Sequence, residues 1–235
     1  MDKKVVLGFT GKKFHGKTTC ANWTSNLLRQ YGRKTVIVAF AEPLKSLVTS
    51  LLFETEWSRN LDTKLKSGDI PLSGTVATIV DRLNRFLIDY NMPHLDPSEI
   101  EFIDVLLKLN KSNPGYIYRK MLQFVGTEIV RQRQPSFWTD LLVESIRDNQ
   151  SDIVLVDDLR FEDELYALKK FPGFNVYLIR TNIEDDNDTH VSETSVEDIG
   201  NLCEYVFEHD NLDELRQVAE LIAPLANQLW LHVNR

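Results

Sequence analysis

Short, nearly continuous runs of apolar residues recur along the chain and are separated by longer stretches with helical spacing. The clearest runs are residues 5–9, 36–40, 153–156 and 176–179, and a shorter one lies at 205–207. Runs of this length are typical of strands that are buried on both faces of a parallel sheet. Strands that alternate with helices predict an α/β fold, here a five-stranded parallel sheet flanked by helices.

The stretches between these runs carry apolar residues three and four positions apart, a spacing that places them on one face of a helix. Pro43 suits the first turn of a helix. Helices are therefore expected at 18–31, from Pro43 onward, and at 118–133, 137–149 and 212–231.

Between about residues 54 and 115 the chain is richer in turn residues, such as Ser67-Gly68. These turns separate two further expected helices, at 76–90 and 97–109. The stretch keeps its apolar periodicity, so we interpret it as a helical insertion rather than a linker. We expect one domain that spans all 235 residues and carries this insertion as a helical subdomain.

The composition limits the class of protein. The formal charge is −8, which disfavours a non-specific nucleic-acid binder because phosphate backbones demand a basic footprint. With 43% hydrophobic residues the chain can bury a sizeable core. The absence of any run of about 18 apolar residues predicts a cytoplasmic protein without a membrane partner. Cys20 and Cys203 form neither a disulfide framework nor a CxxC metal pair, so free buried thiols are expected.

Residues 11–18 read Gly-Lys-Lys-Phe-His-Gly-Lys-Thr and match the phosphate-loop motif GxxxxGK[ST] in full. The segment follows an expected strand and opens an expected helix, as this motif requires. Loop N–H groups and the helix N-terminus would face phosphate oxygens. Lys17 would bridge the β and γ phosphates of ATP, and the Thr18 hydroxyl would ligate Mg²⁺. The expected ATP-binding residues are Gly11, Lys12, Lys13, His15, Gly16, Lys17, Thr18 and Thr19.

The residues inside this loop are larger than in some phosphate loops. Lys12 and Lys13 either contact phosphate or form a solvated surface. His15 is interpreted as a spacer rather than an acid–base group, because phosphoryl transfer depends on positioning and charge more than on proton relays.

Charged residues also follow the apolar run at 153–156. Asp157 and Asp158 end this expected strand, at the position that holds Mg²⁺ in phosphate-loop proteins, directly or through water. We assign the metal to Asp157 together with Thr18, although either aspartate could serve it while the other caps a helix. Arg160 and Glu164 follow, and a fork-shaped donor beside a carboxylate suits recognition of a phosphate and a polar ligand group.

The phosphate loop and four further segments resemble the phage-type deoxynucleoside monophosphate kinases of the phosphate-loop nucleoside monophosphate kinase superfamily. These segments are Phe40-Ala-Glu-Pro-Leu-Lys45, residues 119–128 with Arg131 and Phe137-Trp138, Asp158-Leu-Arg160 with Glu164, and Asn187-Asp-Thr-His190-Val-Ser-Glu193. The resemblance implies a five-stranded parallel sheet, ATP as donor, Mg²⁺, and a deoxynucleoside monophosphate (dNMP) that becomes a diphosphate by in-line transfer of the γ-phosphate. It also implies the host cytoplasm as the location if a phage encodes the chain.

The resemblance further implies that the helical insertion at about 54–115 binds the monophosphate. It also implies which residues act on the substrates. Lys17, Asp158 and Arg160 would be catalytic, and the acceptor would be bound by Lys45, Arg119, Lys120, Glu128, Arg131, Trp138, Asp158, Arg160 and Glu164. Structural alternatives stay open for several of them: Trp138 could belong to the core, Arg119 and Lys120 to a solvated face, and Glu128 could simply pair with Arg131. Residues 181–195 are expected to form either a helix cap or a closing lid.

Three departures from the family pattern and two competing functions remain. Glu42 replaces an Asp or Gly, Leu159 replaces a Thr, and the segment before His190 is acidic where related lids bring arginines. A phosphomevalonate kinase of the animal type would share the phosphate loop and the Asp-x-Arg element, but it would need no aromatic platform. A phosphate-loop ATPase or switch would need a water-positioning residue that is not evident here. The sequence leaves the accepted bases and a homodimer open.

Overall fold

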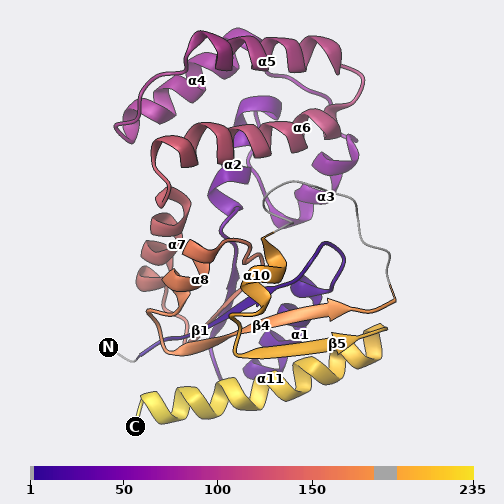
Figure 1. Cartoon of the computed structure of the whole chain (residues 1–235), viewed down its shortest axis with the longest axis vertical. Helices are drawn as coiled ribbons and strands as arrows, with labels where there is room; N and C mark the ends of the chain where they lie inside the picture. The colour runs from indigo at the N-terminus through magenta and orange to yellow at the C-terminus, as the bar shows by residue number, and fades with distance from the viewer. Residues whose placement is uncertain (1–2, 183–194) are drawn as a thin grey trace. The chain divides into compact units, whose positions relative to one another are not determined.

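The computed structural model describes residues 3–182 and 195–235. The chain divides into two compact units (Figure 1). The first unit contains Met1–Phe40 and Thr139–Arg235, and the second contains Ala41–Trp138. The second unit therefore includes the stretch at 54–115 but begins before it and ends after it.

The first unit is built on a five-stranded sheet in which every neighbouring pair is parallel. Its strand order is β2-β3-β1-β4-β5. The strands are β1 (Val5–Thr10), β2 (Thr35–Val38), β3 (Ile153–Val156), β4 (Gly173–Arg180) and β5 (Tyr205–His209). The predicted five-stranded parallel sheet is confirmed. β4 is longer than its apolar run because the polar residue Asn175 is also buried in the strand.

Helices cover both faces of this sheet. On one face α1 (Lys17–Gln30) and α11 (Leu212–Val233) bury a core with alternate residues of β1, β3 and β4. Figure 1 shows α11 running along the sheet. The other face carries α8 (Glu162–Leu168), α10 (Val196–Gly200) and the part of α7 (Phe137–Asp148) that begins at Thr139. Because side chains alternate across a strand, Leu7 faces the first core and Val6 the second.

The second unit is helical. Its helices are α2 (Glu42–Phe53), α3 (Arg59–Ser67), α4 (Val76–Asp89), α5 (Pro97–Leu109) and α6 (Pro114–Gln123), which continues as the π-helical segment η1 (Phe124–Arg131). Local sequence explains the helix starts: the Thr75 and Asp96 side chains accept hydrogen bonds from the first-turn N–H groups of α4 and α5.

Three short helices, α3, α8 and α10, were not predicted. Two of them have only 5 and 7 residues, too few for apolar periodicity to be recognised. α3 begins at the cap residue Ser58, but Leu65 is its only fully buried side chain. Across the described residues, no helix is long and apolar enough to cross a membrane. Both thiols are free: Cys20 is buried, whereas Cys203 is only partly so.

Candidate active site

The phosphate loop lies where β1 ends, at the carboxyl edge of the sheet. β1 ends at Thr10 and α1 begins at Lys17, so the loop leads directly into a helix N-terminus. Gly16 caps α1 with a φ of 79°, and a Cβ there would lie 2.5 Å from Leu215 Cδ2. Glycine is therefore favoured at this position, because a larger residue would be strained in the left-handed conformation and would displace the Leu215 side chain. Phe14 also has a positive φ, 67°, which is strained for an aromatic residue.

The ammonium of Lys17 is hydrogen-bonded to the backbone of the phosphate loop. Lys17 Nζ donates hydrogen bonds to the carbonyl oxygens of Gly11 at 2.5 Å and Lys12 at 2.7 Å. The charge is thus held inside the loop, where a phosphate chain would lie. Lys12 Nζ lies 2.6 Å from Glu197 Oε1, so this side chain has an ion-pair partner rather than solvent alone.

Two buried histidines anchor the loop to neighbouring strands. His15 Nδ1 lies 3.1 Å from the carbonyl oxygen of Leu178 in β4. His209 Nε2, at the end of β5, lies 3.2 Å from the carbonyl oxygen of His15. Carbonyl oxygens only accept hydrogen bonds, so each of these ring nitrogens donates. This arrangement agrees with a spacer role for His15. No sequence motif includes His209, so its contact with the loop could not be predicted from the sequence.

The two aspartates after β3 lie beside the loop and differ in environment. Register pairs Gly8 of β1 with Val156 of β3, so Asp157 and the phosphate loop share one edge of the sheet. Asp157 is buried, whereas the Asp158 Oδ1 atom accepts a hydrogen bond from the Phe40 N–H at 2.7 Å. Asp158 therefore ties the end of β3 to the segment after β2.

Arg160 is fixed through its backbone. Glu164 Oε2 accepts hydrogen bonds from the N–H groups of Arg160 at 2.9 Å and Phe161 at 3.1 Å, which satisfies the N-terminus of α8. Ser195 Oγ donates to the Arg160 carbonyl oxygen at 2.7 Å. Glu164 thus caps the N-terminus of α8. Its predicted contact with the acceptor substrate stays a prediction.

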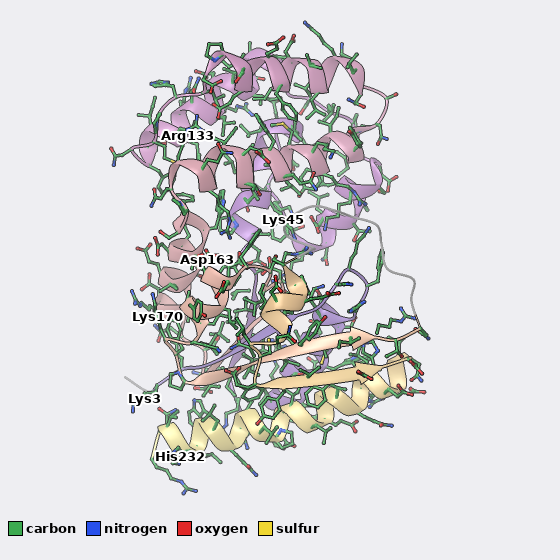
Figure 2. The ribbon with its side chains drawn as sticks, viewed as in Figure 1. Lys3, Lys45, Arg133, Asp163, Lys170 and His232 are labelled. Carbon is green, nitrogen blue, oxygen red and sulfur yellow. The ribbon has the colours of Figure 1, made fainter. Side chains whose placement is uncertain are left out.

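A nearby contact in the same unit escaped sequence reasoning. Thr139 Oγ1 donates to Asp163 Oδ2 at 2.8 Å, and Asp163 is labelled in Figure 2. The bond joins the start of the sheet-facing part of α7 to α8. No sequence spacing connects two residues so far apart, so only the fold reveals the pair.

A second group of charged side chains lies within the helical unit. Lys45 Nζ of α2, labelled in Figure 2, lies 3.5 Å from Asp62 Oδ2, and Lys66 Nζ lies 2.6 Å from the same oxygen. Asp62 Oδ1 faces Trp57 Nε1 at 3.4 Å and the Tyr118 hydroxyl at 3.3 Å. We call these residues the cationic cluster, and it consists of Lys45, Trp57, Asp62, Lys66, Tyr118 and Arg119.

Electrostatics in this cluster reflects crowding of like charges. Burial acts to raise the pKa of Asp62, but the ammonium groups of Lys45 and Lys66 hold it below its ordinary value. Burial lowers the pKa of Lys66, and the charges of Lys45 and Arg119 lower it further. Burial raises the pKa of Tyr118. The structure thus brings one predicted acceptor residue, Lys45, together with Asp62 and Lys66, which sequence reasoning missed. A second predicted acceptor residue, Arg119, belongs to the cluster through the effect of its charge on the pKa of Lys66.

The remaining predicted acceptor residues of the helical unit lie on α6, η1 and α7. Trp138 is 3% exposed, and its Nε1–H donates to the Gly126 carbonyl oxygen at 3.1 Å, so the core alternative describes its packing. Glu128 is exposed and accepts from Gln132 Nε2 at 3.4 Å. Lys120 donates to Gln123 Oε1 at 3.3 Å. Arg131 is half-buried at the end of η1, and roles for these residues toward an acceptor stay predictions.

The expected lid lies almost wholly outside the described residues. Residues 183–194, which include the segment from Asn187 to Glu193, are not described. The choice between a helix cap and a closing lid for 181–195 therefore stays open.

Comparison with known proteins decides the family. A family model described as deoxynucleotide monophosphate kinase matches residues 5–218. The chain belongs to this kinase family. A relative in Acanthamoeba polyphaga mimivirus, named "Putative deoxynucleotide monophosphate kinase", is 30% identical over 97 residues, which cover 36% of this chain and 50% of that protein. The kinase thus matches about half the length of that relative.

Solved structures of other kinases match at low similarity. The adenosine phosphosulfate (APS) kinase CysC of Mycobacterium tuberculosis, as a Cys556Ala mutant, has a TM-score of 0.37 at 13% identity, with 97% of this chain and 99% of that chain covered. Shikimate kinase of Acinetobacter baumannii, in complex with shikimate, has a TM-score of 0.38 at 12% identity, with 97% and 95% covered. The fold class of this chain is therefore taken from its own five-stranded parallel sheet.

Proposed function

We propose that this kinase converts deoxynucleoside 5′-monophosphates to diphosphates by direct in-line transfer of the γ-phosphate of ATP. The observation that carries the proposal is the complete phosphate loop at the carboxyl end of β1, with the Lys17 ammonium held inside it. Phosphoryl transfer depends on positioning and on neutralising charge, and this loop can supply both. Membership of the family supports a monophosphate as the acceptor.

On the donor side, the loop N–H groups and the N-terminus of α1 would hold the phosphates of ATP. Lys17 would bridge the β and γ phosphates, while the two histidine anchors keep the loop shape fixed. Arg160 would stabilise charge on the transferring group through its planar, fork-shaped donors. Asp158 would position either the dNMP acceptor or the guanidinium of Arg160.

The residues at this edge of the sheet fit a magnesium ion. Asp157 offers a buried carboxylate at the end of β3, and Thr18 offers an exposed hydroxyl in the first turn of α1. Oxygen ligands of this kind, completed by waters and substrate phosphates, are what Mg²⁺ requires. Among the described residues no group of three or more His, Cys, Asp or Glu side chains could hold a metal. When bound, the ion would neutralise phosphate charge.

On the acceptor side, we retain Lys45, Arg119, Lys120 and Arg131 as cations for the phosphate of the dNMP. Glu128 and Glu164 would contact base edges or the sugar hydroxyl, and Trp138 would wall the base. The convergence of Lys45 and Arg119 in the cationic cluster supports the first assignment, because a phosphate monoester carries close to two negative charges at neutral pH.

A coupled assay of ADP release tests the proposal. The enzyme is supplied with ATP and Mg²⁺ and then with no acceptor, with each of the four dNMPs, with their ribose counterparts, or with phosphomevalonate. We expect ADP release that depends on a dNMP and forms one diphosphate per ADP. Equal release without acceptor would instead identify an ATPase or switch protein, and release with phosphomevalonate alone would identify the other kinase class.

A further inference from the structure

Two charged members of the cationic cluster, Asp62 and Lys66, have no assigned role. Both residues lie on α3, a helix that contains no recognised motif. Asp62 nevertheless forms an ion pair with Lys45, which is a predicted acceptor residue, and Lys66 forms one with Asp62. Asp62 Oδ2 faces the ammonium groups of Lys45 and Lys66, and Asp62 Oδ1 faces Trp57 and Tyr118. Every oxygen of this carboxylate is therefore engaged, and its side chain is only 15% exposed.

Two of the three cations are clearly more exposed than this carboxylate, whereas the Lys45 side chain is only 19% exposed. The Lys66 side chain is 38% exposed, and Arg119 is exposed on α6. Within the described part of the helical unit, Arg119 has no carboxylate partner within ion-pair distance. The more exposed charges of the cluster are therefore the positive charges of Lys66 and Arg119, whereas its one carboxylate is largely buried.

The charge count of the cluster matches a phosphate monoester. Lys45, Lys66 and Arg119 contribute three positive charges and Asp62 one negative charge, which leaves two positive charges. A phosphate monoester carries close to two negative charges above its second pKa of about 6. Charge-assisted hydrogen bonds from half-buried cations to such a group are among the stronger polar interactions.

We propose that Lys66 is a further contact for the phosphate of the dNMP acceptor, and that Asp62 is the positioning residue that aims Lys66 and Lys45 at it. This inference rests on the proposed function. Asp62 would not touch the substrate; it would hold the two ammonium groups in place before the phosphate arrives. Such preorganisation reduces the ordering that binding must otherwise impose.

Asp62 also favours the protonated form of Lys66. Burial and the charges of Lys45 on α2 and Arg119 on α6 lower the pKa of Lys66, whereas the hydrogen bond and charge of Asp62 oppose this shift. The other titratable side chain that packs here, Tyr118 on α6, has a raised pKa because it is buried, so it stays neutral at the pH values concerned. Anion binding needs the protonated amine, so acceptor binding should weaken as pH rises through the pKa of Lys66. Neutralising Asp62 should move that loss to lower pH.

The test measures KM for the dNMP and for ATP from pH 7 to pH 10 with the full-length enzyme. The variants are Lys66→Met, Lys66→Arg and Asp62→Asn. The chain offers a matched control in the Asp104–Lys108 pair on α5, which has the same helical spacing and the same 2.6 Å separation of Nζ and Oδ2. Asp104→Asn and Lys108→Met therefore remove an equivalent ion pair without altering the cluster.

Lys66→Met should raise KM for the dNMP about ten- to a hundredfold and leave KM for ATP unchanged, since hydrogen bonds to charged groups contribute about 1.5–3 kcal/mol. Lys66→Arg should abolish the alkaline rise of this KM because a guanidinium stays charged. Asp62→Asn should shift the rise to lower pH, and the two control variants should match the wild type in both constants.

The inference is overturned if the wild type turns over a dNMP but Lys66→Met keeps its KM, or if the pH profile of Asp62→Asn coincides with that of the wild type. A merely structural role for the pair predicts a lower melting temperature with both KM values unchanged in the folded enzyme. Should Lys66→Met and Asp62→Asn not fold, the alkaline profile of Lys66→Arg decides alone: a rise equal to that of the wild type rules out Lys66. A wild type that is inactive with every dNMP contradicts the proposed function itself.

Discussion

Replacing Trp138 by alanine separates two roles that the indole could have. The side chain is 3% exposed, its ring is stacked on Phe86 with centroids 6.3 Å apart, and it packs edge-to-face on Phe137 at 4.9 Å. Its Nε1–H satisfies the carbonyl oxygen of Gly126. Truncation therefore opens a cavity in the aromatic core and leaves a buried acceptor without its donor.

The expected cost follows from both losses. Removing a buried Trp side chain costs about 3–5 kcal/mol of unfolding free energy, and a buried carbonyl that loses its partner adds about 1 kcal/mol or more. For a chain of this length, 1 kcal/mol corresponds to roughly 2–4 °C in melting temperature, so Trp138→Ala should melt at least about 6 °C below the wild type. Trp138→Phe keeps an aromatic ring and should lose considerably less.

The assay combines thermal melting with separate titrations of ATP and a dNMP on the same variants. The half-buried Trp23 of α1 provides a control, and Trp23→Ala should destabilise the enzyme less than Trp138→Ala. If Trp138 also walls the acceptor pocket, KM for the dNMP rises about five- to a hundredfold while KM for ATP stays constant, as the loss of base stacking implies. A Trp138→Ala variant that melts with the wild type would refute the packing argument. Lowered stability with unchanged dNMP affinity would remove Trp138 from the acceptor site.

Three further substitutions test the donor side. Lys17→Met should lower the rate on the order of 10²-fold or more with unchanged circular dichroism, since the ammonium supports charge inside the loop; near-normal turnover would show that the loop is not the ATP site. Arg160→Lys should be nearly as damaging to kcat/KM as Arg160→Ala, and retention of most activity would contradict a two-donor role. Gly16→Ala forces a Cβ against Leu215 in a left-handed conformation, which costs about 1–2 kcal/mol or more, so KM for ATP should rise; an unchanged KM and melting temperature would show that the loop adapts.

The sheet could be predicted from the sequence because its signals are local. A buried parallel strand must be apolar on both faces, so β1 and β3 stand out as continuous runs. The phosphate loop is equally local, since its glycines, lysine and threonine serve one turn between a strand and a helix. Strand order is not local, and it is the pairing of β1 with β3 that places Asp157 beside the loop.

The site residues that the sequence did not indicate depend on contacts between distant segments. His209 follows the phosphate loop by nearly the length of the chain, yet it donates to the carbonyl oxygen of His15. The sequence suggests that Glu164 binds a ligand. Its carboxylate also accepts hydrogen bonds from the N–H groups of Arg160 and Phe161, where the start of a helix leaves N–H groups unsatisfied. A carboxylate near a motif is therefore not evidence for a substrate contact until its backbone partners are known.

The cationic cluster shows the same limit most clearly. Asp62–Lys66 and Asp104–Lys108 have identical i, i+4 spacing and identical ion-pair lengths, so the sequence describes both as ordinary helix-surface pairs. Their side chains differ in exposure, at 15% and 38% for the first pair and 33% and 67% for the second. Packing of α2 and α6 around α3 causes this difference, because it adds Lys45 and Tyr118 to one pair. Partial burial weakens solvent screening, so charges in the first pair can influence one another and a ligand in a way that the exposed pair cannot.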